Sequence, residues 1–512
     1  MTQEIMQNWL AKRAQLSPER LAIVDGELRW TFQELYEMVQ KTAKRLHTAG
    51  IQQGDFVALL LTNSFRAPQL IHSVAQASAV TVLLNSRLTA QEIAWQLADS
   101  PTKLLIYDEE FAAVAQQAVV LARKLLYEAN EAERASQFSL LSYQELSDLP
   151  ETSVTFPAHV AMSEVHTLLY TSGTTGTPKG VLLTYGNHWW SAVGSALNLG
   201  LSASDRWLVC VPLFHMSGLS ILLRSLIYGI PAIIHRKFLP SAVNQAILSE
   251  GITLVSVVSA MLLRLVDGLG ERSYPTSFRC MLVGGGPVPP ELLTRCRNQE
   301  IPVFQTYGLT ETASQLATLA PEYMDQKLGS AGKALFPAEI KIVTENGEAM
   351  AGEAGEILVR GPSVTSGYLK DRGSDSFLSG SWLKTGDLGY FDAAGFLYVL
   401  DRRSDLIISG GENVYPAEIE AVLVKHAAVL EAGVTAMADL VWGQVPAAFV
   451  VLRQGAAVTE LELQSFCRSH LAGYKCPKRV YVISQLPRNG ANKLVRRRLQ
   501  ELVPVIETGQ RG

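Results

Sequence analysis

Short runs of apolar residues alternate along this chain with stretches that have the polarity pattern of amphipathic helices. Apolar runs at 55–62 and 80–84 enclose a helix-like stretch at 65–79, and a second such stretch at 89–98 precedes an apolar run at 103–107. Strands that are buried on both faces and separated by helices are typical of parallel sheets. The apolar pattern recurs at 207–211, 231–235, 253–258 and 279–283. We therefore predict an α/β fold with largely parallel sheets.

The length of the chain, 512 residues of which 48% are hydrophobic, predicts more than one domain. The segment 116–136 is rich in Ala, Glu, Arg and Leu and is predicted to be helical on the surface. A hairpin-like segment at 386–400 is followed by a stretch dense in glycine and charge. The remaining residues suffice for one small α+β domain. We place the boundary there, giving predicted domains of residues 1–401 and 402–512.

Charge and cysteine usage exclude several classes of protein. The net charge is −4, from 44 basic and 48 acidic side chains that are interspersed, so a nucleic-acid partner is not expected. The short basic run 496–498 is interpreted as a solvated face of a terminal helix. Five scattered cysteines without a C-x-x-C pair indicate neither a disulfide framework nor a zinc site. The charged N-terminus is no signal peptide and no uninterrupted apolar span would cross a membrane, so we predict a cytoplasmic protein.

Residues 171–180, with the sequence TSGTTGTPKG, form the strongest local motif. Glycine lets a backbone approach a ligand closely, and hydroxyls and amide groups can surround phosphate oxygens. The string is no Walker A loop, because Pro178 and Gly180 stand where that motif needs Gly and Ser or Thr. A flexible turn is the alternative interpretation. We predict phosphate binding by Thr171, Ser172, Gly173, Thr174, Thr175, Gly176, Thr177 and Lys179.

Four further motifs follow at 305–312, 384–389, 401–413 and 486–493. Together with 171–180, they resemble in order and spacing the motifs of the adenylate-forming superfamily, which includes acyl-CoA synthetases, adenylation domains of peptide synthetases and beetle luciferases. The resemblance covers nearly the whole chain. It implies that ATP activates a carboxylic acid as an acyl-adenylate with release of pyrophosphate, and that coenzyme A then takes the acyl group with release of AMP.

The resemblance also implies the architecture. Superfamily members have a large N-terminal domain of two stacked α/β subdomains followed by a distorted β-barrel, and a small mobile α+β C-terminal domain. The C-terminal domain rotates between the two half-reactions. The hinge would lie at Ser404, where many relatives have Asp or Lys. Dimers and tetramers are common among relatives, so the resemblance allows a homo-oligomer.

The roles of individual residues around the nucleotide follow from the motifs. Glu311 matches a ligand of Mg²⁺ and Thr310 a phosphate contact, although a glutamate in such a turn is more often a surface residue. Six residues match the segments that flank adenine and the acyl group in members of the superfamily. They are Gly284, Gly285, Gly286, Thr306, Tyr307 and Gly308. Tyr307 taken alone would more often be a core residue.

Three charged residues match the family positions that bind the ribose and the reacting groups. Asp387 and Arg402 correspond to the residues that bind the ribose hydroxyls, where charge strengthens each hydrogen bond. Asp387 also fits an ordinary turn residue. Lys493 corresponds to the lysine that binds the carboxylate and the α-phosphate as the adenylate forms, and positive charge there lowers the barrier. Many relatives have Gly before this Lys, whereas this chain has Asn492.

The strings around 185–229 and 401–420, and the Asn–Lys pair, resemble the o-succinylbenzoate–CoA ligases of menaquinone biosynthesis. His215, in PLFH, would lie in the acyl pocket in a substrate or catalytic role, although a lone histidine is as often structural. The free benzoate of that substrate needs a cation or donors. Arg224 is a candidate, unless it pairs with a carboxylate at an interface. Further acyl-pocket candidates are Ser259, Gly285, Thr306 and Ser314.

Several other functions stay open on the sequence. A ligase for another aryl acid or a medium-chain fatty acid has the same motifs and differs only in its pocket. A peptide-synthetase adenylation domain is disfavoured because the sequence offers no clear acidic partner for an α-amino group. A luciferase shares the adenylation step. A nucleotide-binding sensor would need a damaged catalytic set, whereas every motif residue is present.

Overall fold

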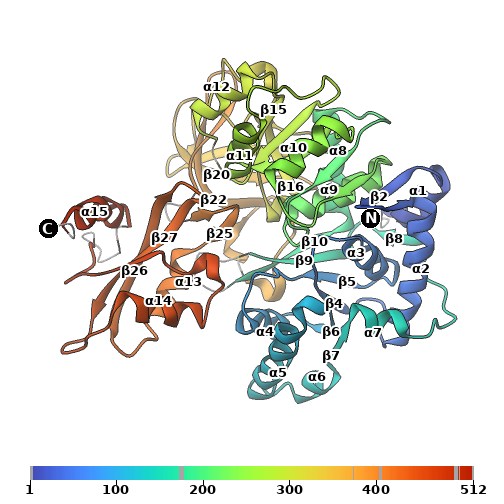
Figure 1. Ribbon diagram of the computed structural model, residues 1–512, viewed down its shortest axis with the longest axis horizontal. Coiled ribbons are helices and arrows are strands. Elements are labelled where there is room, and N and C mark those ends of the chain that lie inside the picture. The colour runs from blue at the N-terminus through green and yellow to red at the C-terminus, as the bar shows by residue number, and fades with distance from the viewer. Residues whose placement is uncertain are drawn as a thin grey trace.

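The computed structural model describes residues 4–171, 178–286, 288–372, 374–402, 406–488, 494 and 496–509. Helices and strands alternate through the large N-terminal region, which forms two layered α/β subdomains at the right of Figure 1. A small C-terminal domain lies at the left of the same view. The predicted α/β class with this two-part architecture is confirmed.

The first subdomain is built on a six-stranded sheet in which all neighbours except β10 and β9 are parallel. The predicted strands at 55–62, 80–84 and 103–107 are confirmed as its central members. In spatial order, the strands are β10 (Lys179–Thr184), β9 (Val165–Thr171), β5 (Val80–Leu83), β4 (Phe56–Leu60), β6 (Thr102–Tyr107) and β7 (Ser139–Ser142). Its helices are α3 (Arg66–Gln76), α4 (Ala90–Asp99), η1 (Glu109–Phe111), α5 (Ala112–Glu128), α6 (Ala132–Gln137) and α7 (Tyr143–Asp148).

The second subdomain has a nine-stranded sheet whose six central strands are parallel and include all four apolar runs predicted between 207 and 283. In spatial order, the strands are β17 (Lys333–Ala334), β16 (Ser314–Leu319), β15 (Val303–Leu309), β14 (Cys280–Gly284), β13 (Leu254–Val258), β11 (Trp207–Val209), β12 (Ala232–Ile234), β2 (Leu21–Asp25) and β3 (Leu28–Thr31). The helices of this part are α1 (Trp9–Leu16), α2 (Phe32–Thr48), α8 (Tyr185–Leu199), α9 (Met216–Tyr228), α10 (Pro240–Ser249), α11 (Ser259–Leu269) and α12 (Pro290–Asn298). A short pair, β1 (Ile5–Gln7) and β8 (His159–Ala161), ties the N-terminus to the connection before β9.

The predicted surface helix at 116–136 consists of two helices. Asn130 has a φ of 61°, a left-handed conformation that ends α5 before α6 begins. Alanines at 115, 118 and 122 are buried against the first sheet, whereas Val120 and Tyr127 are exposed. The segment therefore covers the sheet with one face and meets solvent with the other.

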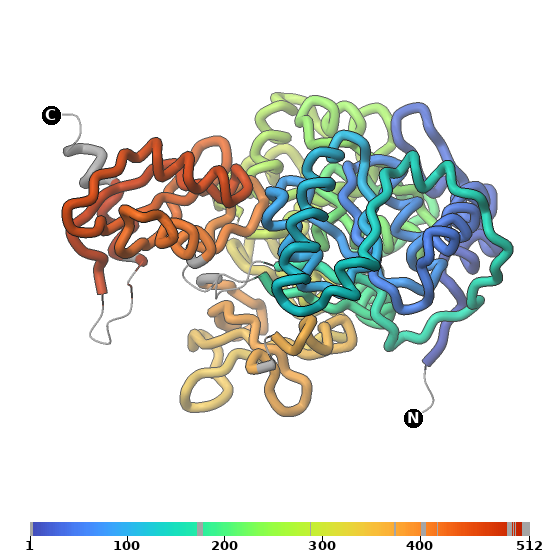
Figure 2. The backbone as a smooth tube through the Cα atoms, turned by 90° about the horizontal axis from the view of Figure 1, so that it is seen from below, coloured from blue at the N-terminus to red at the C-terminus, as the bar shows by residue number. Residues whose placement is uncertain are grey.

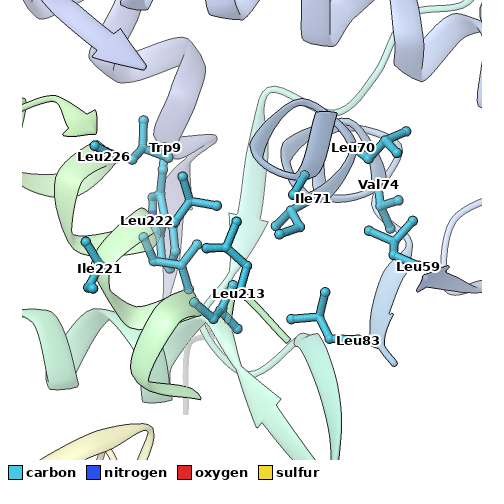
Figure 3. Close-up of a cluster of buried hydrophobic side chains, with 14 of the residues drawn as sticks. Trp9, Leu59, Leu70, Ile71, Val74, Leu83, Leu213, Ile221, Leu222 and Leu226 are labelled. Atoms are coloured by element: carbon cyan, nitrogen blue, oxygen red, sulfur yellow. The ribbon is translucent and has the colours of Figure 1, made fainter. Parts of the chain in front are cut away.

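The two α/β subdomains share one apolar core, drawn in Figure 3. Helix α3 contributes one side of it and α9 the other, and Trp9 of α1 packs against the α9 side. The side chains labelled there are Trp9, Leu59, Leu70, Ile71, Val74, Leu83, Leu213, Ile221, Leu222 and Leu226. Because this core spans both sheets, it fixes β9, which leads into the phosphate loop, against α9, which begins beside His215.

An antiparallel half-barrel follows the second sheet along the chain and lies at the bottom of the view in Figure 2. Its strands are β18 (Glu339–Thr344), β19 (Gly347–Glu348), β20 (Gly355–Arg360), β21 (Phe377–Leu378), β22 (Trp382–Phe391) and β23 (Leu397–Arg402). The hairpin predicted at 386–400 is confirmed as β22 and β23. Short 3₁₀ turns in this part of the chain are η2 (Thr310–Thr312), η3 (Pro321–Tyr323), η4 (Leu369–Asp371) and η5 (Ser374–Ser376).

The C-terminal domain has its own five-stranded sheet and core. Its elements are β24 (Ile407–Ser409), β25 (Glu412–Val414), α13 (Pro416–Leu423), β26 (Val429–Asp439), β27 (Gly443–Leu452), α14 (Glu460–Arg468), η6 (Gly473–Lys475), β28 (Arg479–Val482) and α15 (Arg496–Gly509). Arg402 belongs to β23 of the half-barrel, so the boundary at 401/402 stays a prediction. Within the described residues, none of the helices is long and apolar enough to cross a membrane.

Gly332 joins the second sheet to the half-barrel and permits a test of that junction. Its φ is +84°, and a Cβ there would lie 1.9 Å from the carbonyl carbon of Thr318. We expect Gly332→Ala to lower the unfolding free energy by about 3 kcal/mol, because left-handed strain and a backbone clash add. Gly329→Ala is the control, since Gly329 has a similar φ of +78° and open space around it. Equal thermal shifts for the two variants, measured by calorimetry, would contradict the clash.

Candidate functional site

A cavity of about 250 Å³ opens where β13, β14 and β15 end, between the second sheet, the half-barrel and the C-terminal domain. The carboxyl ends of parallel strands lie at one edge of a sheet, and ligands commonly bind there. The structure brings ten of the predicted site residues together in the lining of this cavity: Thr171, His215, Gly284, Gly285, Thr306, Gly308, Thr310, Glu311, Ser314 and Asp387.

Five other predicted residues do not line this cavity. Lys179 is the first residue of β10, and Gly286 faces the C-terminal domain, since a Cβ there would be 3.0 Å from the side chain of Ile408. Ser259 is the first residue of α11. Tyr307 and Arg224 are buried beneath the surface of the cavity.

The remaining predicted residues lie outside the described part of the chain. These are Ser172, Gly173, Thr174, Thr175, Gly176, Thr177, the hinge residue Ser404 and Lys493. The backbone of Arg402 is described and pairs with Asp387 across β22 and β23. The roles assigned to Arg402 and to the residues outside the described part of the chain stay predictions.

Tyr368 organises the phosphate end of the cavity. Its hydroxyl donates a hydrogen bond to Oε1 of Glu311 at 3.1 Å, and Nζ of Lys179 lies 5.4 Å from its ring centroid. Thr310 and Glu311 share the turn η2, and the carbonyl of Glu311 accepts from the amide of Thr365 at 2.7 Å. Among the described residues, no group of three or more His, Cys, Asp or Glu is arranged so that it could hold a metal ion by itself. One carboxylate and one hydroxyl suit Mg²⁺, which usually completes its shell with phosphate oxygens and water.

Asp387, which is predicted to bind the ribose, lines the same cavity and is only 5% exposed. Its Oδ2 accepts a 2.7 Å hydrogen bond from the hydroxyl of Tyr307, and its backbone amide donates to Oγ1 of Thr385 at 3.0 Å. The ring of Tyr307 packs in the core between the second sheet and the half-barrel. The hydroxyl of Tyr307 therefore positions Asp387, and only 6% of the tyrosine is exposed.

A second cavity, of about 400 Å³, runs outward between the N-terminal region and the C-terminal domain. The two cavities share Val211, His215, Ser217, Val258 and Gly411. Four basic residues, Arg87, Arg236, Lys237 and Arg264, line the second cavity, against a single carboxylate, that of Glu412. Such an excess of cations favours a ligand with phosphate groups.

Glu412 holds His215 where the two cavities meet. Its Oε2 lies 3.0 Å from Nε2 of His215, and its Oε1 accepts from Arg87 at 2.6 Å. Burial alone would raise the pKa of Glu412, but His215 and Arg87 together lower it below its usual value. Glu412 comes from β25, whereas His215 and Arg87 belong to the N-terminal region, so this contact joins the two domains.

Arg224 is a buried cation without a carboxylate partner among the described residues. It is 2% exposed, its NH2 donates to Oγ of Ser191 at 3.1 Å, and its guanidinium lies 5.9 Å from the Trp207 ring centroid. The hydroxyl of Ser191 donates in turn to the carbonyl of Ala313, next to the cavity residue Ser314. Burial and Arg224 hold the pKa of His188 at about 3, so this neighbour is neutral. The alternative of an ion-paired arginine is not seen.

Two family models match the chain. AMP-binding enzyme matches residues 10–369, and AMP-binding enzyme C-terminal domain matches residues 418–493. The chain belongs to the AMP-binding enzyme family. Among curated proteins it is 51% identical over 503 residues to the 2-succinylbenzoate–CoA ligase of Geobacillus sp. (strain WCH70), covering 98% of each chain. The corresponding ligase of Geobacillus kaustophilus is 53% identical, over 98% of this chain and 99% of that one.

Solved structures of an o-succinylbenzoate–CoA synthetase are also similar to this chain. The o-succinylbenzoate–CoA synthetase of Bacillus subtilis, as a double mutant bound with its product analogue, is 44% identical, with 97% of this chain and 99% of that chain covered and a TM-score of 0.91. The same enzyme with its acyl-adenylate intermediate, at the same identity and with 97% and 98% covered, gives only 0.74. Both structures are of the same enzyme, and over its length this chain superposes more closely on the one bound with the product analogue.

Leu494 packs with Leu486 and Leu499 in a cluster that includes α15, at the far left end of Figure 1 and away from the cavity. Instead, Gly411, Asn413 and other residues around the β24–β25 hairpin face the cavity.

Sequence reasoning missed several residues that shape the site. Tyr368 follows a glycine in a loop that contains none of the five motifs. Arg87 lies in a turn after β5, far from every motif. Glu412 lies inside the motif at 401–413, and this position was the only sequence signal that it belongs to the site. Their importance depends on contacts between segments distant in sequence.

Tyr307→Phe tests the hydrogen bond that positions Asp387. The variant keeps the packed ring and removes only the hydroxyl, so we expect AMP affinity to fall about tenfold, the scale of a hydrogen bond to a charged group. Isothermal titration calorimetry with AMP measures the change. An unchanged affinity at unchanged melting temperature would mean that Asp387 is held by other groups.

Proposed function

We propose that this protein is an AMP-forming acid–CoA ligase that converts o-succinylbenzoate to o-succinylbenzoyl-CoA in menaquinone biosynthesis. The observation that carries the proposal is 51% identity, over 98% of both chains, to a 2-succinylbenzoate–CoA ligase. The cavity that unites Thr171, Glu311 and Asp387 supports the nucleotide chemistry. Cytoplasmic location, homo-oligomer formation and the absence of a nucleic-acid partner remain predictions from the sequence.

The first half-reaction joins the acid to AMP. A carboxylate oxygen attacks the α-phosphorus of ATP, and pyrophosphate departs. Glu311 would hold Mg²⁺ together with the phosphates, and the bound ion would supply positive charge against the triphosphate. Thr171 and Thr310 line the phosphate end, Asp387 holds the ribose, and Lys493 places positive charge on the reacting oxygens as the two anions approach.

The second half-reaction transfers the acyl group to coenzyme A. The thiol sulfur attacks the acyl carbonyl and AMP leaves. The second cavity supplies the route for the thiol, because it reaches His215 from a basic outer mouth that suits the phosphates of coenzyme A. The described arrangement of domains corresponds to this step, in view of the TM-score of 0.91 to the enzyme bound with a product analogue. Rotation about Ser404 would bring Lys493 to the cavity for the first step.

Arg224 supports the choice of acid. A benzoate carboxylate entering an apolar pocket needs a compensating charge, and a buried cation without an acidic partner provides one. Ser191 and the adjoining turn at Ala313 connect the guanidinium to the cavity wall at Ser314. Fatty-acid ligases bind an acid without this second charge and gain nothing from such a group.

A coupled assay tests the reaction itself. Purified protein with ATP, Mg²⁺, coenzyme A and o-succinylbenzoate should form the thioester with stoichiometric AMP, whereas benzoate or octanoate should react poorly. Lys493→Ala should slow adenylate formation roughly 10²–10³-fold, as for other preorganised electrostatic contacts. ADP as the nucleotide product, or equal activity on alkanoates, would refute the proposal.

Arg224→Met tests the recognition of the benzoate, with a side chain of similar shape and no charge. We expect the KM for o-succinylbenzoate to rise at least about tenfold, because a buried carboxylate loses its cation, and the KM for ATP to stay unchanged. The control substrate is 4-oxo-4-phenylbutanoate, which lacks the benzoate carboxylate. If the variant handles this analogue as poorly as it handles o-succinylbenzoate, relative to wild type, Arg224 acts through packing alone.

A further inference from the structure

Lys475 lies in a buried cluster of charges between the two domains. Its Nζ donates to Oε1 of Glu92 and to Oε1 of Glu418, each at 2.7 Å. The side chains are 5%, 11% and 10% exposed, respectively. Ion pairs so far removed from solvent are weakly screened, and breaking one leaves an uncompensated charge.

The electrostatics show that Lys475 is held as a cation by both carboxylates. Burial alone would lower its pKa, but Glu418 and Glu92 together raise it above the usual lysine value. Burial raises the pKa of Glu418, and Lys475 counteracts that effect only in part.

The two partners of Lys475 differ in where they belong. Glu418 is on α13 of the same domain and moves with Lys475 as one body. Glu92 is on α4 of the N-terminal region, so its bond exists only while the domains are placed as described. Asn85 and Arg87, on the same segment, also contact the C-terminal domain, at Tyr474 and Glu412.

We propose that the Glu92–Lys475 ion pair is a positioning contact that stabilises the thioester-forming arrangement and has no part in adenylate formation. The inference rests on the proposed function, in which this placement of the domains performs the second half-reaction. Neither residue lines the main cavity. Lys475 lines a smaller cavity of about 80 Å³ beside Thr171 and Thr310, and it does so only while the domains are placed as described, whereas Glu92 lines neither cavity.

The Glu92–Lys475 ion pair can break when the domains move apart. When the domains separate, Lys475 keeps Glu418, and Glu92 keeps its second role, in which its Oε2 accepts hydrogen bonds from the amide and the hydroxyl of Thr89 at the start of α4. Neither charge is then left without a partner. A contact that favours one arrangement without trapping the protein in it is what an alternating two-step reaction requires.

Glu92→Gln separates the two roles of this side chain, because the amide oxygen can still cap α4 while the charge is lost. Two single-turnover rates are compared: adenylate formation from ATP and acid, and thioester formation after coenzyme A is added to preformed acyl-adenylate. We expect the thioester rate to fall roughly tenfold or more, as for loss of one partner of a buried ion pair, and the adenylation rate to be unchanged.

Two control variants define the interpretation. Thr89→Ala removes the cap and leaves the ion pair, so it should spare the ratio of the two rates even if the melting temperature falls. Glu418→Gln removes the partner that travels with Lys475 and makes the lysine more dependent on Glu92. This variant should therefore shift the ratio in the opposite direction, toward thioester formation.

Failure of the inference is distinguishable from failure of the proposed function. If wild-type protein forms both adenylate and thioester while Glu92→Gln slows both steps equally or neither, the positioning role is wrong. Wild-type protein that forms no thioester at all would instead overturn the proposed function.

Discussion

Strands β13, β14 and β15 run parallel and end at one edge of the nine-stranded sheet, and the whole site depends on that edge. The backbone turns away from each strand at its carboxyl end, so glycine, threonine and glutamate from separate segments meet there. Gly284, Thr306 and Glu311 share one cavity for this reason. The half-barrel then adds Asp387 as the facing wall, and the C-terminal domain closes the remaining side with Gly411 and Asn413.

Much of this could be predicted because the information is local. A run such as 55–62 is apolar on both faces, which suits a strand covered by helices on either side, and it forms β4. The motif around Thr310 and Glu311 is contiguous, so its residues reach the cavity together. The register of β22 and β23 places Asp387 opposite Arg402, while their shared role at the ribose stays a prediction.

The environment of a side chain was harder to predict, because it is set by segments far away in sequence. Tyr307 was expected beside adenine, but the half-barrel covers its ring and leaves its hydroxyl to hold Asp387. Gly286 was expected to contact ligand, but the C-terminal domain packs against it through Ile408. Lys475 and Glu92 carry no local signal, since 383 positions separate them and only the placement of the domains pairs them.

The meeting of the two cavities at His215 and Gly411 has a consequence for turnover. A finished thioester would extend through both cavities, with its acyl end under the half-barrel and its nucleotide end at the basic mouth. Since each cavity has walls from both domains, the predicted rotation of the C-terminal domain would release the product. That same rotation would admit the next ATP, so product release and resetting of the enzyme are a single movement. Accumulated acyl-CoA would then hold the enzyme in its last state and slow the activation of further acid, without any separate regulatory site.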